Sequence, residues 1–457
     1  MSSGRAKPDD KIYALINYED AYVQPLILSA LEKRLPPSTH TLITSLSQLP
    51  SLSSRLLQFV QYEAIDFDHL LQHPSTSLAN AYVIRKALIR KHYLSTTIAN
   101  WLVKYPDSLL KEHVKPSVAF EVDYAEFLDE ALVEAWELKE SWARNAERGE
   151  GEEMEWWILK PGMSERGQGI RLFSSEEELK SIFEEWDPPE SGDEDEEEEH
   201  EPTEKKDGSR NGIITSQLRH FIAQPYIHPP LLLPLPSTTT SPPPLHKFHI
   251  RTYVLATGAL KLHIFRPMLA LFASDPYLAP RTSQDAMNAH LTNTCLQSPT
   301  THESCVHPFW SLPDSLPAQP PHLTPPADIP SGALPTPHWK TSVFDQICKI
   351  SATTFEAAAR GMGIHFQPLP NAFEIFGLDF MVSVDEGGGG GGRLKTWLLE
   401  VNAFPDFGQT GAGLKGVVGD LFEGVVRVGV AGFFGGGEEE GEEEGFVRVL
   451  DVDLGRR

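Results

Sequence analysis

Two apolar segments near the C-terminal end, with a glycine run between them, constrain the fold of this chain most strongly. Residues 373–384 read FEIFGLDFMVSV, residues 393–404 read RLKTWLLEVNAF, and six consecutive glycines lie between the two segments. Apolar runs of this length separated by glycines predict a β-hairpin, whose two strands pair antiparallel. We therefore expect residues far apart in this stretch to face each other across the hairpin.

Three polar residues interrupt these apolar strands. Asp379 lies in the first strand, and Glu400 and Asn402 lie two residues apart in the second, so Glu400 and Asn402 point to the same face of an extended chain. Burying an ionised carboxylate is costly unless something pairs with it. Carboxylate and amide oxygens without His or Cys suit Mg²⁺. The alternative is a structural role, in which Glu400 forms an ion pair with a lysine.

The chain of 457 residues is long enough for two or three structural units. Apolar residues at helical spacing predict helices at 77–106, 122–147 and 341–360 and a terminal amphipathic helix from Gly413. Ala256–Gly258 predicts a hairpin turn. We expect four segments: a small N-terminal α/β domain at 8–75, a central subdomain at 76–228, a C-terminal subdomain at 229–434, and an acidic Gly/Glu-rich tail at 435–457. The central subdomain would contain a disordered acidic insertion at 189–207, and the C-terminal subdomain a proline-rich loop at 311–338.

The charge of the chain is concentrated in two acidic segments. The formal net charge is −25, of which residues 190–207 contribute −9 and residues 438–444 contribute −6. The remainder is moderately acidic, which argues against direct nucleic-acid binding, since such binding needs a basic surface. The three cysteines show no disulfide or metal-site spacing, and no secretory signal or run of eighteen apolar residues occurs. We therefore expect a cytoplasmic or nuclear protein that is not inserted in a membrane.

Two segments have the composition of anion-binding or nucleotide-binding elements. Lys160 ends an apolar strand, and Gly167 and Gly169 follow it in a turn whose backbone N–H groups could approach an anion. The extended segment 222–227, IAQPYI, offers backbone groups that could read the edge of an adenine. The alternatives are an ordinary β-turn for the glycines and a linker for residues 222–227.

A third segment places cationic side chains on one face of a strand. In KFHIRTYVL, Lys247, His249 and Arg251 alternate with apolar residues, so all three point to the same side. Such a face is a plausible phosphate clamp, with Arg266 on the neighbouring strand adding a guanidinium. The alternative is a solvated basic strand face. The motifs of serine hydrolases, zincins and P-loop proteins are absent from the sequence.

Seven blocks in order resemble the tubulin–tyrosine ligase family of ATP-grasp ligases. They are WWILKPGMSERGQGI, IAQPYIHPPLLL, KFHIRTYVL, IFRPMLALFASDPY, HLTNTCLQ, FEIFGLDFMV and WLLEVNAFP, and the resemblance extends from about Ser77 to Val430. It is closest to fungal members, including the ligase half of a P-body-associated yeast protein. The resemblance implies an α/β (α+β) ATP-grasp fold, in which two α/β subdomains clamp ATP between antiparallel sheets.

The resemblance also implies roles for individual residues. ATP phosphates would be bound by Lys86, Lys160 and the loop Gly167, Gln168, Gly169 and Ile170. Adenine would be lined by Gln224, Pro225, Tyr226 and Ile227, with Lys247 and His249 facing the nucleotide. Mg²⁺ would be held by Asp379, Glu400 and Asn402, the γ-phosphate and the activated carboxylate by Arg251 and Arg266, and the incoming amino acid by Thr292 and Asn293.

The implied reaction joins an amino acid, most simply tyrosine, to a protein carboxylate such as the tubulin C-terminus through an acyl phosphate. A basic groove that includes Arg85, Lys86, Arg90 and Lys91 would receive the acidic tail. The alternatives are a weakly active or inactive nucleotide-binding module that docks onto mRNA-decapping factors in P-bodies, and a polyglutamylase or glycylase. An ATP-grasp ligase with a small-molecule acceptor is also left open.

Three positions depart from the family pattern. His249 replaces the usual Asp beside the ribose, Pro267 replaces the acidic residue after Arg266, and Phe404 replaces a smaller residue. Imidazole is not a carboxylate acceptor, so we expect His249 to alter nucleotide binding.

Overall fold

The structure, a computed structural model, forms two compact units. The smaller unit consists of Pro116–Tyr226 and Ala279–Met287, and the larger unit contains the rest of the chain. This grouping differs from the four expected segments, because residues 8–75 and most of residues 229–434 belong to one unit. The described residues are 11–149, 152–162, 167–186, 219–236, 238–281, 287–292, 304–317, 319, 338–385, 393–435 and 445–455. The expected acidic insertion, most of the proline-rich loop and Asn293 lie outside these ranges.

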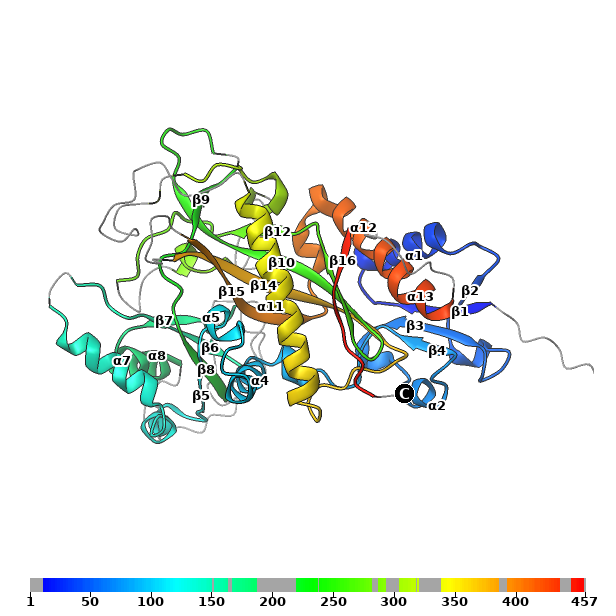
Figure 1. The fold of residues 1–457 in the computed structure, drawn as a ribbon, viewed down its shortest axis with the longest axis horizontal. Coiled ribbons are helices and arrows are strands. Elements are labelled where there is room, and N and C mark those ends of the chain that lie inside the picture. The colour runs from blue at the N-terminus through cyan, green and yellow to red at the C-terminus, as the bar shows by residue number, and fades with distance from the viewer. Residues whose placement is uncertain are drawn as a thin grey trace, which may run out of the picture. The chain divides into compact units, whose positions relative to one another are not determined.

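The larger unit begins with a four-stranded parallel sheet (Figure 1). Its order is β2-β1-β3-β4, with strands β1 (Ile12–Asn17), β2 (His40–Ile43), β3 (Arg55–Val60) and β4 (Ser77–Ala79). Helix α1 (Val23–Arg34) buries Val23, Ile27, Ala30 and Leu31, which line one face because they recur every three to four residues. Helix α2 (Phe67–Gln72) begins at Asp66, whose side chain accepts a hydrogen bond from the His69 N–H. The predicted N-terminal α/β element is therefore present.

An eight-stranded sheet forms the centre of the larger unit. The long strand β10 pairs antiparallel with β14, and β14 pairs antiparallel with β15, which is the hairpin predicted from the sequence. Figure 1 shows helix α11 running across this sheet. The strands are β9 (Leu232–Pro234), β10 (Leu245–Thr257), β11 (Lys261–Phe265), β12 (Leu269–Phe272), β13 (Val306–Pro308), β14 (Phe373–Asp385), β15 (Arg393–Ala403) and β16 (Phe446–Asp451). The remaining helices of this unit are α3 (Lys86–Ile89), α4 (Lys91–Lys104), α5 (Leu110–His113), α11 (Trp339–Gly361), α12 (Lys415–Val425) and α13 (Gly432–Phe434).

The two faces of β10 pack against different helices. Even-numbered residues, such as Ile250 and Val254, share a hydrophobic core with buried residues of α11. The odd-numbered Tyr253 and Leu255 share a core with buried residues of α1 and α12. Because successive strand residues point to opposite faces, Lys247, His249 and Arg251 lie on the odd-numbered face, away from α11.

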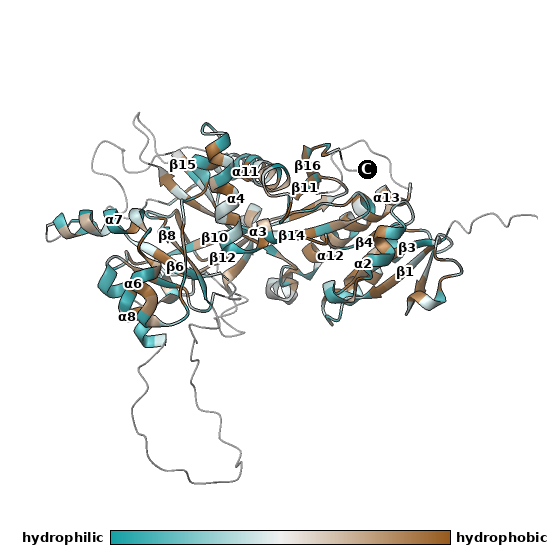
Figure 2. Ribbon diagram, turned by 90° about the horizontal axis from the view of Figure 1, so that it is seen from below, coloured by the Kyte–Doolittle hydropathy of each residue, from teal (hydrophilic) through white to brown (hydrophobic). Residues whose placement is uncertain are grey.

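The smaller unit is built on an antiparallel sheet with an aromatic core. Its strand order is β5-β8-β6-β7, and its core contains Phe120, Phe173, Phe183, Phe221 and Trp186. Figure 2 shows helix α7 with hydrophilic and hydrophobic residues alternating along it, as expected for a helix with one buried side. The elements are β5 (Val118–Glu121), α6 (Leu128–Ala131), α7 (Trp136–Glu147), β6 (Trp157–Pro161), β7 (Arg171–Phe173), α8 (Glu176–Trp186) and β8 (His220–Pro225).

Several local predictions are confirmed, and three need correction. The hairpin turn after β10, the helix predicted at 341–360 and the terminal helix at α12 are present. The segment 77–106 is not one helix, because residues 77–79 are recruited as β4 by pairing with β3. The segment 122–147 is divided into α6 and α7 by the non-helical residue Ala135. The expected acidic tail contains β16, which pairs with β11.

The helices have no membrane-spanning candidate. Within the described residues, none is both long and apolar enough to cross a bilayer.

Candidate nucleotide and metal site

Three neighbouring strands of the large sheet place three charged residues in one row. In the register of β10 and β14, Arg251 lies opposite Asp379, and in the register of β14 and β15, Asp379 lies opposite Glu400. The β14–β15 register shifts immediately after Asp379, so that Leu399 is an extra residue at this point. Such bulges change the direction of nearby side chains. The row Arg251–Asp379–Glu400 is therefore a product of strand pairing.

Arg251 and Asp379 form a buried bidentate ion pair. The Nη2 atom of Arg251 donates to Oδ2 of Asp379 at 2.9 Å, and Nε donates to Oδ1. Asn402 Nδ2 donates to Asp379 Oδ2 at 3.3 Å and to Glu400 Oε1 at 3.1 Å. The predicted convergence of Asp379, Glu400 and Asn402 is confirmed.

The carboxylates in this row carry more negative charge than Arg251 alone neutralises. Burial raises the pKa of Asp379 to about 6; Arg251 opposes this rise, and the neighbouring Glu400 adds to it. The Nζ atom of Lys91, at the start of α4, lies 3.5 Å from the Oε2 atom of Glu400. A site with two adjacent carboxylates is favourable for a divalent cation, because the cation relieves the repulsion between them.

His249 lies beside the carboxylate of Asp379 and is fully inside the protein. Its Nδ1 atom is 2.6 Å from the hydroxyl oxygen of Thr292, and its Nε2 atom is 3.6 Å from Asp379 Oδ1 and has no hydrogen-bond partner among the described residues. Burial, reinforced by the charges of Arg251 and Lys247, lowers the pKa of His249 to about 3. The imidazole is therefore neutral at physiological pH.

The cationic face of β10 is buried, so the alternative of a solvated basic strand is wrong. Lys247 is 2% exposed and His249 is 5% exposed. Burying cationic groups is expensive unless anions or strong dipoles compensate for them. Asp379 supplies part of that compensation, and the phosphates of a nucleotide could supply more.

The smaller unit brings together two of the predicted nucleotide contacts. Lys160 on β6 is 8% exposed, and its Nζ atom donates to Gln224 Oε1 at 2.8 Å. Gln224 on β8 in turn donates from Nε2 to Ser117 Oγ at 2.7 Å. The neighbouring backbone is partly used already, since Tyr226 N–H donates to the Trp156 carbonyl at 2.8 Å.

The predicted glycine turn has the backbone geometry that favours glycine. Gly167 has φ = 75° and Gly169 has φ = 73°, in the left-handed region that other residues rarely adopt. Gln168 between them is exposed, and Ile170 is buried. Pro225 is half-buried and Tyr226 is buried, whereas Ile227 belongs to the larger unit and packs with Met381 and Trp397.

Two residues that were predicted to contact phosphates, Lys86 and Arg266, do not lie in the row Arg251–Asp379–Glu400. Lys86 is exposed on α3. Arg266 is also exposed, and its guanidinium carbon lies 4.9 Å from the centre of the Trp310 ring and 5.2 Å from that of Phe344, a residue of α11. Arg266 therefore lies on the α11 side of the sheet, whereas Arg251 lies on the odd-numbered face.

The expected basic groove also needs correction, because Arg85 is buried. Its Nε atom pairs with Glu374 Oε1 at 2.9 Å. Its guanidinium carbon lies 3.8 Å from the centre of the Tyr62 ring and 5.0 Å from the centre of the Phe404 ring. Phe404, the position where the family usually has a smaller residue, thus packs against this cation. Arg85 is unavailable to an acidic substrate tail.

Sequence reasoning allowed for a lysine beside Glu400 but did not identify it as Lys91, and it missed the contact between Thr292 and His249. Lys91 is expected in a surface groove but approaches Glu400, and Thr292 is expected to contact the amino acid but contacts His249. Each pair joins segments that are distant in sequence, and the pattern around each residue alone gives no signal of its partner. The other members of the row were predicted because each is a polar residue within an apolar stretch, which is a weak signal.

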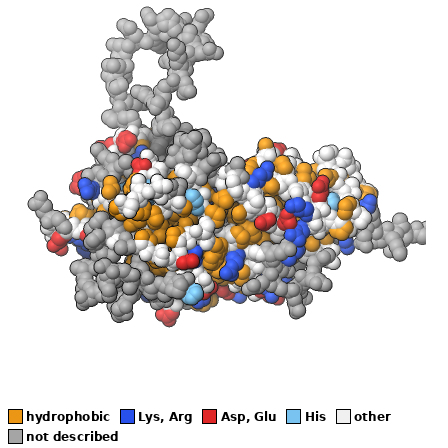
Figure 3. Space-filling model, turned by 90° about the horizontal axis from the view of Figure 1, so that it is seen from above, with side chains coloured by type: hydrophobic (Ala, Val, Ile, Leu, Met, Phe, Trp, Pro, Cys, Tyr) orange, Lys and Arg blue, Asp and Glu red, His pale blue; other side chains and the backbone are white. Residues whose placement is uncertain are grey.

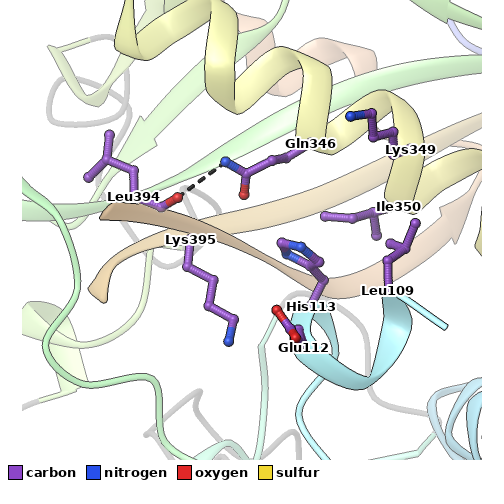
Figure 4. A pocket seen from close by; sticks show the side chains of 8 residues that line it. All are labelled: Leu109, Glu112, His113, Gln346, Lys349, Ile350, Leu394 and Lys395. Atoms are coloured by element: carbon purple, nitrogen blue, oxygen red, sulfur yellow. Dashed lines mark hydrogen bonds between the residues drawn. The ribbon is translucent and has the colours of Figure 1, made fainter. Parts of the chain in front are cut away.

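A small pocket elsewhere in the larger unit has a structural explanation (Figure 4). It has a volume of about 140 Å³ and is lined by residues of α5, α11 and β15. Gln346 donates to the Leu394 carbonyl at 3.2 Å and accepts from Thr396 N–H at 2.9 Å, while His113 Nδ1 lies 2.7 Å from the Thr396 carbonyl. These side chains satisfy backbone groups along β15, which prevents that strand from pairing with another chain.

Comparison with known proteins identifies relatives across almost the whole chain. The sequence pattern described as the tubulin–tyrosine ligase family matches residues 77–318 and 333–435. A Schizosaccharomyces pombe protein described as a probable tubulin–tyrosine ligase is 42% identical over 437 residues, which cover 95% of this chain and 94% of that protein. The probable tubulin–tyrosine ligase PBY1 of Saccharomyces cerevisiae is 36% identical, and the match covers 94% of this chain and 54% of PBY1.

A solved structure confirms the predicted ATP-grasp fold. The C-terminal domain of K. lactis Pby1 is 32% identical, with a TM-score of 0.65, and the alignment covers 97% of this chain and 99% of that domain. That domain is described as an ATP-grasp enzyme that interacts with the mRNA-decapping enzyme Dcp2.

Proposed function

The chain belongs to the tubulin–tyrosine ligase family, and from this premise we propose that it is an ATP-dependent ligase that joins an amino acid to a protein carboxylate. The observation that best supports this proposal is the row Arg251–Asp379–Glu400, in which Asp379 is buried, beside the buried Lys247. It combines cations suited to phosphates with carboxylates suited to a divalent metal, on adjacent strands of an ATP-grasp fold.

The proposed reaction has two steps whose charge changes match these residues. In the first, an oxygen of the acceptor carboxylate attacks the γ-phosphorus of ATP, the bond to the β-phosphate oxygen breaks, and an acyl phosphate and ADP form. In the second, the amine of the amino acid attacks the acyl carbon, phosphate leaves, and the nitrogen loses a proton to become an amide. Lys247 and Arg251 would stabilise the negative charge on the transferring phosphoryl group.

The residues present fit Mg²⁺ by the chemistry of their donors. Asp379, Glu400 and Asn402 would hold the ion, which when bound neutralises charge on the phosphates. In this structure the amide nitrogen of Asn402 faces the carboxylates, so its oxygen reaches a cation only after the amide rotates. Among the described residues, no three His, Cys, Asp or Glu side chains form a finished metal cage. Phosphate oxygens and waters would therefore complete the coordination.

The proposal assigns the other nucleotide contacts to the smaller unit and leaves Arg266 out. Lys160, Gln224 and the turn at Gly167 and Gly169 would bind phosphates and adenine, because they offer an ammonium, an amide and backbone N–H groups. Arg266 is omitted because its guanidinium lies over Trp310 and Phe344.

The acceptor that we propose is a protein with an acidic C-terminal tail, most simply tubulin in the cytoplasm. The names of the two yeast relatives support this choice. On the face shown in Figure 3, the Lys and Arg side chains of the described residues are interspersed with acidic and hydrophobic ones and form no continuous basic stripe. Local cations such as Arg90 would contact the acidic tail.

Incorporation of labelled amino acids tests the proposal. The full chain is incubated with Mg-ATP, detyrosinated tubulin and each labelled amino acid in turn, beside a Glu400→Gln control. We expect one amino acid to be incorporated by the native protein and none by the control. Absence of both incorporation and ATP binding would overturn the proposal.

A cheaper measurement tests nucleotide binding alone. Mg-ATP should raise the melting temperature of the native protein, because a ligand that binds only the folded state stabilises it. The Asp379→Ala variant should lose that increase.

The second candidate function is a weakly active or inactive nucleotide-binding module that docks onto mRNA-decapping factors in P-bodies. The described interaction of the K. lactis domain with Dcp2 favours it, as does His249 in place of the usual Asp. If Mg-ATP binds, no amino acid is ligated to any acceptor, and the chain captures the decapping enzyme, this second function replaces the first.

A further inference from the structure

The Nε2 atom of His249 is a buried polar atom that lies near a carboxylate oxygen. His249 is 5% exposed, and Nε2 has no hydrogen-bond partner. The Oδ1 atom of Asp379 lies 3.6 Å away, beyond the usual hydrogen-bond range of up to about 3.2 Å. Leaving such an atom unsatisfied destabilises the folded protein, so its position calls for a ligand.

Thr292 defines the direction in which this nitrogen points. Its hydroxyl oxygen lies 2.6 Å from Nδ1, and in the tautomer in which Nδ1–H donates to this oxygen, Nε2 carries a lone pair that is buried. Asp379 Oδ1 already accepts a hydrogen bond from Arg251 Nε. A lone pair and a carboxylate oxygen that face each other repel, unless a cation lies between them. Metal-binding histidines are commonly oriented in this way, by a hydrogen bond from the second ring nitrogen.

We propose that His249 Nε2 is a ligand of the divalent cation that Asp379 binds together with the nucleotide, which makes this site select transition-metal ions such as Mn²⁺ over Mg²⁺. The inference rests on the proposed function and deepens it. It concerns a residue that differs from the carboxylate usual at this position in the family.

The distance between the two atoms is compatible with a shared ion. Two ligands that are each about 2.1 Å from one ion are about 3.0 Å apart at a right angle and about 3.6 Å apart at 120°. The observed separation of 3.6 Å lies at the upper end of this range. Imidazole is a better ligand for transition-metal ions than for Mg²⁺, which prefers oxygen. A nitrogen ligand therefore shifts the preference of the site towards transition-metal ions.

Pulsed electron paramagnetic resonance on the Mn²⁺ complex tests the inference directly. The full chain is loaded with Mn²⁺ and the β,γ-methylene analogue of ATP, which cannot transfer its terminal phosphoryl group. We expect nitrogen modulation of the Mn²⁺ echo at the frequencies of a directly bound imidazole. Growth of the native protein with ¹⁵N-labelled histidine should change the modulation from the ¹⁴N to the ¹⁵N pattern. This labelling separates histidine from adenine nitrogens and needs no substitution.

Substitutions then identify the residue. His249→Asp should abolish the nitrogen modulation. In this variant, the excess of Mg²⁺ needed to displace bound Mn²⁺ should be about tenfold lower than in the native protein. Thr292→Val should weaken the modulation. His246→Asn is the matched control, because His246 lies on the same strand but bonds the Ala273 carbonyl through Nδ1. It should leave the modulation unchanged.

Each outcome supports or overturns a distinct claim. If Mn²⁺ and the analogue bind to the native protein without histidine modulation, this inference falls and the proposed function stands. The inference also falls, and the proposed function again stands, if the modulation persists in a folded His249→Asp protein. If neither Mn²⁺ nor Mg²⁺ promotes nucleotide binding, both claims fall.

Discussion

Strand β14 carries two buried arginine–carboxylate pairs, five residues apart, that serve different purposes. Glu374 pairs with Arg85, and Asp379 pairs with Arg251. Both carboxylates are almost fully buried, with exposed fractions of 0% and 4%. Burial and an ion pair alone therefore do not distinguish a functional carboxylate from a structural one.

The surroundings of the two pairs differ in charge balance. Glu374 has one cation and a backbone N–H, from Tyr82 at 3.1 Å, and Arg85 is further held by the rings of Tyr62 and Phe404. Asp379 faces a second carboxylate, Glu400, and a histidine nitrogen without a hydrogen-bond partner. The structural pair joins one carboxylate to one arginine, whereas the candidate site gathers a second carboxylate and a neutral histidine around its pair, and these groups suit a metal ion.

The largest expected effect concerns the structural pair. Arg85→Gln leaves the buried Glu374 carboxylate without its counter-charge, and breaking such a pair by removing one partner costs about 3–5 kcal/mol. We expect the free energy of unfolding, measured with urea, to fall by that amount, while the folded variant keeps its affinity for Mg-ATP. If the unfolding free energy of this variant equals that of the native protein, the pair does not have the structural role assigned to it.

Substitution in the candidate site should show the reverse pattern. Glu400→Gln removes one of two repelling carboxylates, so the unfolding free energy without ligand should stay within about 1 kcal/mol of the native value. The rate of amino-acid ligation should fall about 10²–10³-fold, as when a preorganised electrostatic group is lost. A stability loss as large as that of Arg85→Gln would erase the distinction between the two regions.

The pH dependence of stability sharpens the comparison further. Burial raises the pKa of Glu374 from 4.5 to about 7, although Arg85 opposes the rise. The folded state therefore binds more protons than the unfolded state between these values, so this group's contribution to stability is present below pH 4.5 and is lost as the pH rises to about 7. Relative to Glu374→Gln, the native protein should lose about 1–3 kcal/mol of unfolding free energy across this window. Parallel pH profiles of the two proteins would contradict the expectation.

The smallest effect is expected at Arg266. Its exposed guanidinium stacks on Trp310 and Phe344, and such contacts contribute about 0.5–1 kcal/mol at exposed sites. Arg266→Gln should lower the melting temperature slightly and change the ligation rate less than about threefold, corresponding to under 1 kcal/mol. A loss of ligation rate comparable to that of Glu400→Gln would show that Arg266 takes part in the reaction.

Much of the site was predictable because it depends on local patterns. The alternation in 247–251 places Lys247, His249 and Arg251 on one face, and the two apolar runs around six glycines predict the hairpin that brings Asp379 to Glu400. Strand geometry and antiparallel pairing impose these relations whatever the rest of the chain does. The family resemblance then predicted the ATP-grasp fold, which the structural comparison confirms.

The remaining contacts were not predictable from local pattern. Arg85 meets Glu374, Lys91 meets Glu400, and Thr292 meets His249 across long stretches of sequence. Basic residues at helical spacing indicated a surface groove, but tertiary packing buries Arg85 and turns Lys91 towards the site. Likewise, Arg266 follows a strand next to that of Arg251, and only the packing of Trp310 and Phe344 places its guanidinium on the α11 side.

The sequence by itself thus determined which residues share a strand face and which chemistry they can support. The tertiary structure decided which charged groups are matched within the protein and which await a ligand. The physical reason is that strand periodicity is a property of the local backbone, whereas the balance of charge around a buried group depends on side chains from distant segments.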